Sequence, residues 1–272
     1  MSLKLDDVLA FDDSLHDIFE KSCTRFMPVL KKSNFLETMQ SLFGLMASIN
    51  SIKLGVYDLA ETCDTHLYVL KILYRSLLEQ FLRFEFLFLR FIETGDEEIG
   101  SEYRKYSAIS ETIAYIEASQ MAATMAGKST DDIILKKLKK SHPDFDISKR
   151  SLKEITDKWK HRNIIRYLTS HFKKSTDAPE FLLKIIPDYA NLSSFVHGGT
   201  SAEEYFHNII NDDLLKDEVV STAINSCFIA AIVKNQLLVA ITKIDPSFEE
   251  DRNRFTSRLF QFEMAVGSIS EA

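Results

Sequence analysis

The sequence is poor in the residues that break a chain or crosslink it. Its 272 residues include only 8 glycines, 5 prolines and 3 cysteines. So few glycines and prolines exclude a fold of many short strands joined by tight turns, and favour long segments. Cys23, Cys63 and Cys227 are odd in number and far apart, which fits neither a disulfide framework nor a zinc-binding spacing. Reduced cysteines are typical of the cytoplasm, so we expect a cytoplasmic protein.

The sequence also lacks an uncharged apolar run of membrane-spanning length. The N-terminus "MSLKLDDVLAFDD" has no basic start followed by an apolar run, so we expect no signal peptide. The two most apolar segments are "FLRFEFLFLRFI", which contains Arg83 and Glu85, and "AINSCFIAAIVKNQLLVAI", which contains Lys234. A spanning helix needs about 20 residues with almost no charge. We therefore predict two buried core helices and no membrane association.

Apolar residues make up 45% of the chain and include 20 phenylalanines, enough for a sizeable core. They recur with helical spacing almost throughout, and no stretch alternates like a strand. The sequence predicts a single all-α domain over residues 1–272, a bundle of roughly eight to ten helices. Pro28 is expected to end the first helical region. Asn34 and Glu37 have the spacing of a capping box for the next helix.

The net charge of −7 is unevenly distributed. Residues 128–174 contain 14 lysines and arginines against 6 aspartates and glutamates, and residues 128–150 are a candidate inserted basic lobe. Such a basic stretch in an acidic protein suggests contact with nucleic acid, although it also fits a solvated loop and helix face. The predicted RNA-binding residues are Lys158, Lys160, Arg162, Lys173 and Lys174.

Most motifs that bind phosphate, metal or cofactor are missing. The sequence has no glycine-rich phosphate loop, no nucleophile elbow and no HExxH. A di-iron bundle needs two Glu-x-x-His pairs, and only Glu204 with His207 has that spacing. We therefore expect no metal and no cofactor.

The stretch "DYANLSSFVHGG" indicates a helix that stops at two glycines. Tyr189, Ser193 and His197 are four residues apart, so they share one face of that helix. Apolar neighbours suggest that the helix is well buried, where a neutral histidine can act as acid or base near pH 7. The alternative is a histidine at a helix C-terminus that satisfies the last carbonyls.

Two further pairs combine an arginine with an acid or a histidine. Arg75 and Glu79 in "RSLLEQ" are at i and i+4, and form either a buried pair or an exposed polar stripe with Lys71 and Arg83. Arg166 precedes His171 with four residues between them. This spacing suits metal-free RNA cleavage, in which the histidine moves the 2′-hydroxyl proton and the arginine stabilises phosphate charge. The alternative is an exposed basic helix.

"RSLLE", Trp159 in "DKWKHRN" and "YANLSSFVHGG" together resemble a bacterial all-helical family of unknown function. Its members carry an R-x-L-x-E helix and a late Y-x-x-x-S-x-x-V-H-G ending, and the match spans about residues 67–199. That family resembles HEPN proteins, which are often dimeric and include many ribonucleases of phage defence or toxin systems. The HEPN hallmark is Arg-x4–6-His, which Arg166 and His171 match, except that Tyr167 replaces the usual polar residue.

The resemblance implies an HEPN-like core and a metal-independent ribonuclease that acts in antiviral defence or as a toxin. His197 is the predicted general acid and base, although no arginine lies within the six residues before it. Arg75 would then supply the phosphate cation, Glu79 would orient it, and Tyr189 and Ser193 would complete the pocket. Arg166 and His171 are the second-choice catalytic pair. The expected partners are RNA and a second copy of the chain. The alternative function is a non-enzymatic helical module that binds a protein partner or a small ligand.

Overall fold

The structure is a computed structural model, and it confirms the all-α prediction. Every regular element among the residues it describes is a helix, and no strand occurs in that part of the chain. The described residues are 5–62, 66–95, 97–127, 140, 143, 154, 157–174, 180–211 and 214–270.

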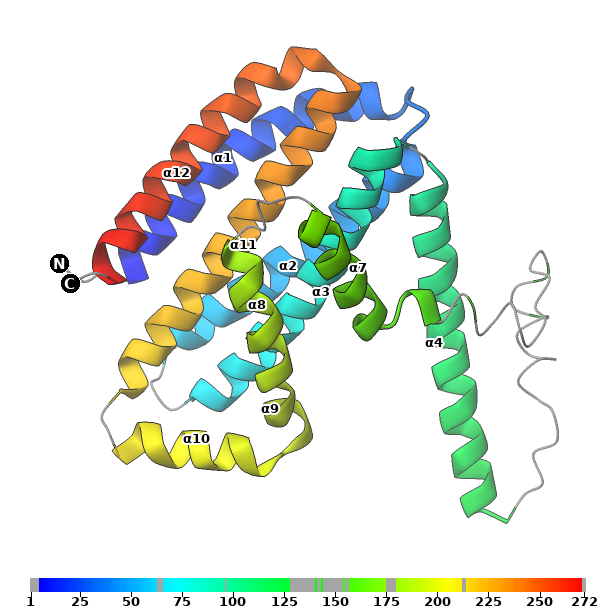
Figure 1. Cartoon of the computed structure of the whole chain (residues 1–272), viewed down its shortest axis with the longest axis vertical. Helices are drawn as coiled ribbons and strands as arrows, with labels where there is room; N and C mark the ends of the chain where they lie inside the picture. The colour runs from blue at the N-terminus through cyan, green and yellow to red at the C-terminus, as the bar shows by residue number, and fades with distance from the viewer. Residues whose placement is uncertain are drawn as a thin grey trace.

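Figure 1 shows the order of the helices along the chain. They are α1 (Leu5–Leu30), α2 (Leu36–Thr62), α3 (Leu67–Thr94), α4 (Glu98–Met125), α7 (His161–Lys174), α8 (Glu180–Asn191), α9 (Ser193–His197), α10 (Thr200–Asn211), α11 (Leu215–Ile244), the short 3-10 helix η2 (Pro246–Phe248) and α12 (Glu249–Ser270).

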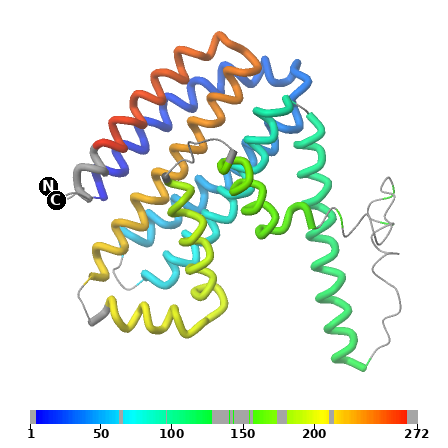
Figure 2. Tube along the Cα trace, viewed as in Figure 1, coloured from blue at the N-terminus to red at the C-terminus, as the bar shows by residue number. Residues whose placement is uncertain are grey.

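The centre of the molecule is formed by α2, α3 and α11, which pack against one another over most of their lengths. The first and last helices, α1 and α12, lie side by side and cover one side of α11 (Figures 1 and 2). On the other side, α7 and α8 pack on α3, and α9 joins α8 to α10. The N-terminal part of α4 packs against α2 and α3, whereas its far end extends away from the other described helices (Figure 1).

The two segments predicted to be buried core helices are α3 and α11. Most of the apolar residues of α11 are buried, including Ala223, Val233 and Ile241. By length and composition α11 is apolar enough to cross a membrane, but 67% of its most apolar window is buried inside the fold. Packing against α1, α2, α3 and α12 therefore accounts for its hydropathy.

Two local predictions were wrong. Pro28 lies inside α1, which continues to Leu30, because a proline in the last turn removes only one helical hydrogen bond. The N-terminus of α2 is not closed by a capping box at Asn34. Instead, the Glu97 carboxylate accepts the backbone N–H of Thr38 at 3.1 Å, and also that of Glu37. An acid distant in sequence therefore satisfies free donors at this helix start and complements its dipole.

This cap lies where α4 crosses α2 at very short range. Gly100 donates its N–H to Thr38 Oγ1 at 3.1 Å, and a Cβ atom at Gly100 would lie 2.3 Å from the Thr38 Cα. Only glycine fits such a backbone approach. The crossing fixes the start of α4, from which Glu102 reaches the segment before α7.

The candidate basic lobe at 128–150 falls almost entirely outside the described residues. Its existence therefore stays a prediction.

Candidate functional site

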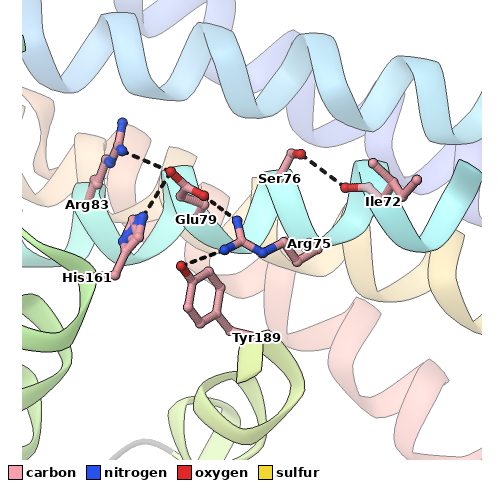
Figure 3. A network of polar contacts seen from close by, with 7 residues as sticks. All are labelled: Ile72, Arg75, Ser76, Glu79, Arg83, His161 and Tyr189. Carbon is pink, nitrogen blue, oxygen red and sulfur yellow. Dashed lines mark hydrogen bonds and ion pairs between the residues drawn. The ribbon is translucent and has the colours of Figure 1, made fainter. Parts of the chain in front are cut away.

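A polar face of α3 carries three charged side chains in succession. Arg75, Glu79 and Arg83 are spaced four residues apart, so they follow one side of the helix. Glu79 is bonded on both sides: Arg75 Nη1 donates to Oε2, and Arg83 Nη2 donates to Oε1 at 2.9 Å. One carboxylate thus bridges two guanidinium groups (Figure 3).

Tyr189 extends this cluster from α3 to α8. Arg75 Nη2 donates to the Tyr189 hydroxyl at 2.8 Å, and the guanidinium lies over the tyrosine ring at 4.3 Å from its centroid (Figure 3). The hydrogen bond and the cation–π contact orient Arg75 from two directions. The predicted association of Arg75, Glu79 and Tyr189 is therefore observed.

The histidine of the cluster is His161, the first residue of α7, which was not among the sequence candidates. Its Nε2 lies 2.9 Å from Glu79 Oε1, and its ring contacts the Tyr189 ring edge-to-face at 5.2 Å between centroids. Figure 3 shows the five side chains of Arg75, Glu79, Arg83, His161 and Tyr189 converging from three helices. We call this set the α3–α7–α8 network.

Aromatic packing fixes the start of α7 against α3. Trp159 is buried, contacts Phe86 edge-to-face at 5.1 Å, and donates its indole N–H to Glu102 at 3.1 Å. Further along α7, Tyr167 contacts the same Phe86 ring at 4.9 Å. Trp159 is the only tryptophan of the chain, so the sequence could have indicated that this segment is buried, but not that His161, two residues later, meets Glu79.

The network is partly buried. The exposed fractions of the Arg75, Glu79 and His161 side chains are 14%, 25% and 18%. Burial lowers the pKa of His161, and the nearby Arg83 and Arg75 lower it further, against the opposing effect of Glu79. Burial raises the pKa of Tyr189. At neutral pH the network therefore contains a neutral histidine beside one carboxylate and two guanidiniums.

Some polar atoms of the network have no hydrogen-bond partner. These are Arg75 Nε and both ring nitrogens of His161, all buried. The contact between His161 Nε2 and Glu79 is short, but it lacks the alignment of a hydrogen bond. Buried polar groups are normally satisfied, so these three atoms depart from the usual pattern.

His197 and Ser193 are not part of this network. Helix α8 ends at Asn191, and both residues belong to α9, which is five residues long and ends at Gly198 in the left-handed conformation with φ 63°. The buried residue of α9 is Phe195, which packs on Tyr68. His197 follows two residues later, about 200° around the helix, and is therefore exposed rather than buried as expected. Neither side chain hydrogen-bonds to any described residue.

The second-choice pair lies on α7 but is not joined. His171 Nδ1 is 2.8 Å from Glu93 Oε1, whereas Arg166 Nη1 donates to Asn163 Oδ1 at 3.3 Å. Five helical residues correspond to about 140°, so the two side chains face different directions.

The predicted RNA-binding residues differ in their surroundings. Lys158 pairs with Glu102, and Lys160 Nζ lies 2.6 Å from Asp157. Arg162 and Lys173 are exposed on α7, and the side chain of Lys174 lies outside the described part of the chain. Within the described residues, no group of three or more histidines, cysteines or acids is arranged to hold a metal ion.

No protein-family model, no curated protein and no solved structure matches this chain. The resemblance to HEPN proteins therefore stays a prediction.

Proposed function

We propose that the protein is a metal-independent ribonuclease whose acid–base group is His161 and whose phosphate-binding cations are Arg75 and Arg83. The observation that carries the proposal is a histidine 2.9 Å from a carboxylate that two guanidiniums share, in surroundings that lower the histidine pKa. With His161 neutral, the network has one net positive charge. A phosphodiester carries one negative charge and complements it.

The proposed reaction needs only a base, an acid and stabilisation of charge. His161 takes the proton from a ribose 2′-hydroxyl as that oxygen forms a bond to phosphorus, and the bond from phosphorus to the 5′-oxygen breaks. The leaving 5′-oxygen then receives the proton from His161. The products are a 2′,3′-cyclic phosphate and a 5′-hydroxyl.

Each other member of the network has a defined task. The Arg75 guanidinium supplies one cation for the phosphate, and Arg83 adds a second cation on the other side of Glu79. Glu79 and Tyr189 are positioning residues, because they hold the Arg75 guanidinium from two directions. Arg162 and Lys173, exposed on the same helix as His161, contact flanking RNA phosphates.

The proposal keeps the broader expectations from the sequence. These are a cytoplasmic homodimer that acts on RNA in antiviral defence or as a toxin, as the resemblance to HEPN proteins implies. His161 takes the role first assigned to His197, because His161 contacts Glu79 and His197 is exposed with no such partner.

The test is incubation of the purified full chain with tRNA and total RNA in the presence of EDTA. We compare the wild type with His161→Ala, and use His171→Ala and His197→Ala as matched controls. His161→Ala should reduce cleavage by about 10²–10⁴-fold, the usual contribution of acid–base catalysis. Both controls should cleave at the wild-type rate and yield cyclic phosphate ends.

Circular dichroism melts establish that each variant is folded. Cleavage that persists in His161→Ala but is lost in His197→Ala would return the catalytic role to His197. Absence of cleavage by the folded wild type would contradict the ribonuclease proposal.

The second candidate is a non-enzymatic helical module that binds a protein partner or a small ligand. It is favoured by the fact that Glu79 and Tyr189 use their contacts to tie α3 to α7 and α8. In that case His161→Ala would change stability without affecting any RNA.

A further inference from the structure

Two adjoining cavities lie on the side of the molecule where α8 faces α11. The larger has a volume of about 610 Å³ and is bounded by residues of α3, α8, α9, α10 and α11. The smaller, of about 230 Å³, is lined mainly by apolar side chains, among them Phe181, Ile185, Ile224 and Phe228. Tyr74, Lys184 and Asn225 line both cavities, so they mark the junction.

Part of the polar wall is already paired and therefore electrically neutral. Lys71 Nζ lies 2.7 Å from Glu218 Oε2 and donates to Thr222 Oγ1 at 3.1 Å. Burial acts to raise the pKa of Glu218, but hydrogen bonds from Lys71 and Tyr205 outweigh it and lower that pKa. Because these charges are paired, this part of the wall holds the shape of the cavity but offers a ligand no unpaired charge.

The residues at the junction, by contrast, have unused hydrogen-bonding groups. Tyr74 is only 5% exposed, and its hydroxyl makes no hydrogen bond with any described residue. The Asn225 amide, half-buried in α11, likewise makes no hydrogen bond with any described residue. Lys184 is exposed, and Asp188 is half-buried one turn later on α8. Neither forms an ion pair within the described part of the chain. The Tyr74 ring is almost completely buried, and its hydroxyl is left at the cavity wall, where a ligand can take its hydrogen bond.

These observations restrict the chemistry of the ligand. A purely apolar ligand would leave the Tyr74 hydroxyl and the Asn225 amide unpaired against hydrocarbon, which is unfavourable. A highly charged anion is disfavoured, since Asp188 and Glu218 both line the larger cavity and Lys71 is already paired. The ligand therefore combines an apolar part that carries hydrogen-bonding groups with a polar portion of low charge.

We propose that the two cavities bind an adenine nucleoside or its 5′-monophosphate. The base occupies the small cavity against the rings of Phe181 and Phe228. Its edge meets the Asn225 amide, whose donor and acceptor match adenine, and the Tyr74 hydroxyl. The ribose hydroxyls meet the Asp188 carboxylate in the larger cavity, and a single phosphate pairs with Lys184.

This inference does not depend on the ribonuclease proposal. Tyr74, Asn225, Lys184 and Asp188 are outside the α3–α7–α8 network, and ligand binding is measured without RNA. Failure of one proposal therefore leaves the other standing.

The test is isothermal titration calorimetry of the full chain with adenosine, AMP, ATP and cytidine. Adenosine and AMP should bind, and ATP and cytidine should bind at least tenfold more weakly. Tyr74→Phe keeps the ring and removes only the hydroxyl, so it should weaken AMP binding by about tenfold, as should Asn225→Leu. Tyr115→Phe is the matched control, because Tyr115 is 73% exposed on α4, and it should bind AMP like the wild type.

Two outcomes would overturn the assignment. The first is no adenosine or AMP binding at millimolar concentration by a chain with the wild-type circular dichroism spectrum. The second is AMP binding that both Tyr74→Phe and Asn225→Leu leave unchanged.

Discussion

Two regions of the molecule place one carboxylate between two cations, but at different depths. In the α3–α7–α8 network, Glu79 bridges Arg75 and Arg83, whose side chains are 14% and 29% exposed. In the core, Asp12 of α1 bridges Lys53 of α2 and Lys234 of α11, whose side chains are 4% and 0% exposed. The same charge pattern therefore occurs both near the surface and in the interior.

The difference in depth changes the chemistry of the cations. Arginine keeps its charge in any protein environment, and partial exposure lets water share the cost of holding it. Lysine titrates more readily, and burial lowers the pKa of Lys234, although Asp12 opposes this effect. The outer network is thus suited to meet an anion, whereas the inner cluster fixes how three helices pack.

The largest change in stability is expected when the carboxylate of the core cluster, Asp12, is removed. Asp12→Ala leaves two lysines buried without a counter-charge, so the free energy of unfolding should fall by about 3–5 kcal/mol. The measurement is urea unfolding at pH 7. The matched control is Asp251→Ala, whose partner Arg25 is 59% exposed, and this should cost less than about 1 kcal/mol. Equal losses in the two variants would contradict the assigned difference in depth.

A third carboxylate, that of Glu85, is buried without a cation beside it in the described part of the chain. Glu85 is 1% exposed, accepts a hydrogen bond from Gln236 at 2.7 Å, and forms no ion pair within the described residues. Burial raises the pKa of Glu85 to about 7. Because the folded state then binds more protons than the unfolded state, this group's stability contribution is present at acidic pH. It is lost as the pH rises from about 4.5 to about 7.

Glu85→Gln should therefore stabilise the protein at pH 8 by up to about 3 kcal/mol, and have little effect near pH 4. Paired urea unfolding curves at the two pH values measure this. A variant that is less stable than the wild type at pH 8 would show that the buried Glu85 is ionised and favourably partnered there.

The variant Lys234→Met tests how much the second buried lysine of the core cluster contributes to stability. Methionine keeps an unbranched side chain, one atom shorter than that of lysine, and removes its charge, and Lys53 remains to pair with Asp12. The variant should match the wild type at pH 7 or exceed its stability by about 1 kcal/mol.

The lowered pKa of Lys234 means that the unfolded state binds more protons below the ordinary value of 10.5. This lysine therefore makes stability rise with pH between its folded-state pKa and 10.5. The stability difference between wild type and Lys234→Met, measured by urea unfolding across pH 8–10.5, should follow that rise. A difference independent of pH would contradict the shifted pKa.

The smallest effect on stability is expected from Glu79→Gln in the outer network. Partial exposure limits the loss to about 1 kcal/mol, but the pKa of His161 should fall further, because Glu79 is the group that raises it. NMR titration of the His161 ring measures this, with Glu93→Gln beside His171 as the matched control that leaves His161 unchanged. A rise in the His161 pKa would contradict the assigned electrostatics.

The sequence correctly predicted the all-helical class. It also paired Arg75 with Glu79, because residues four apart on a helix meet whatever the rest of the chain does. It did not find His161, which is far from Glu79 in sequence and carries no local pattern that joins the two. It overestimated the burial of His197, because the short helix α9 presents Phe195 rather than His197 to the core.

What the sequence by itself determined is therefore the local structure, through the spacing of apolar residues and the positions of glycine. Hydrogen bonds within a helix and its apolar face depend on neighbours a few residues away. Only the tertiary structure decided that Asp12 lies between buried lysines and that Glu79 lies between partly exposed arginines. It also decided that His161 is the histidine beside Glu79. The partners of these side chains depend on how deeply they are buried and on contacts between helices. The energy of a charge is set by the medium around it rather than by its neighbours in the chain.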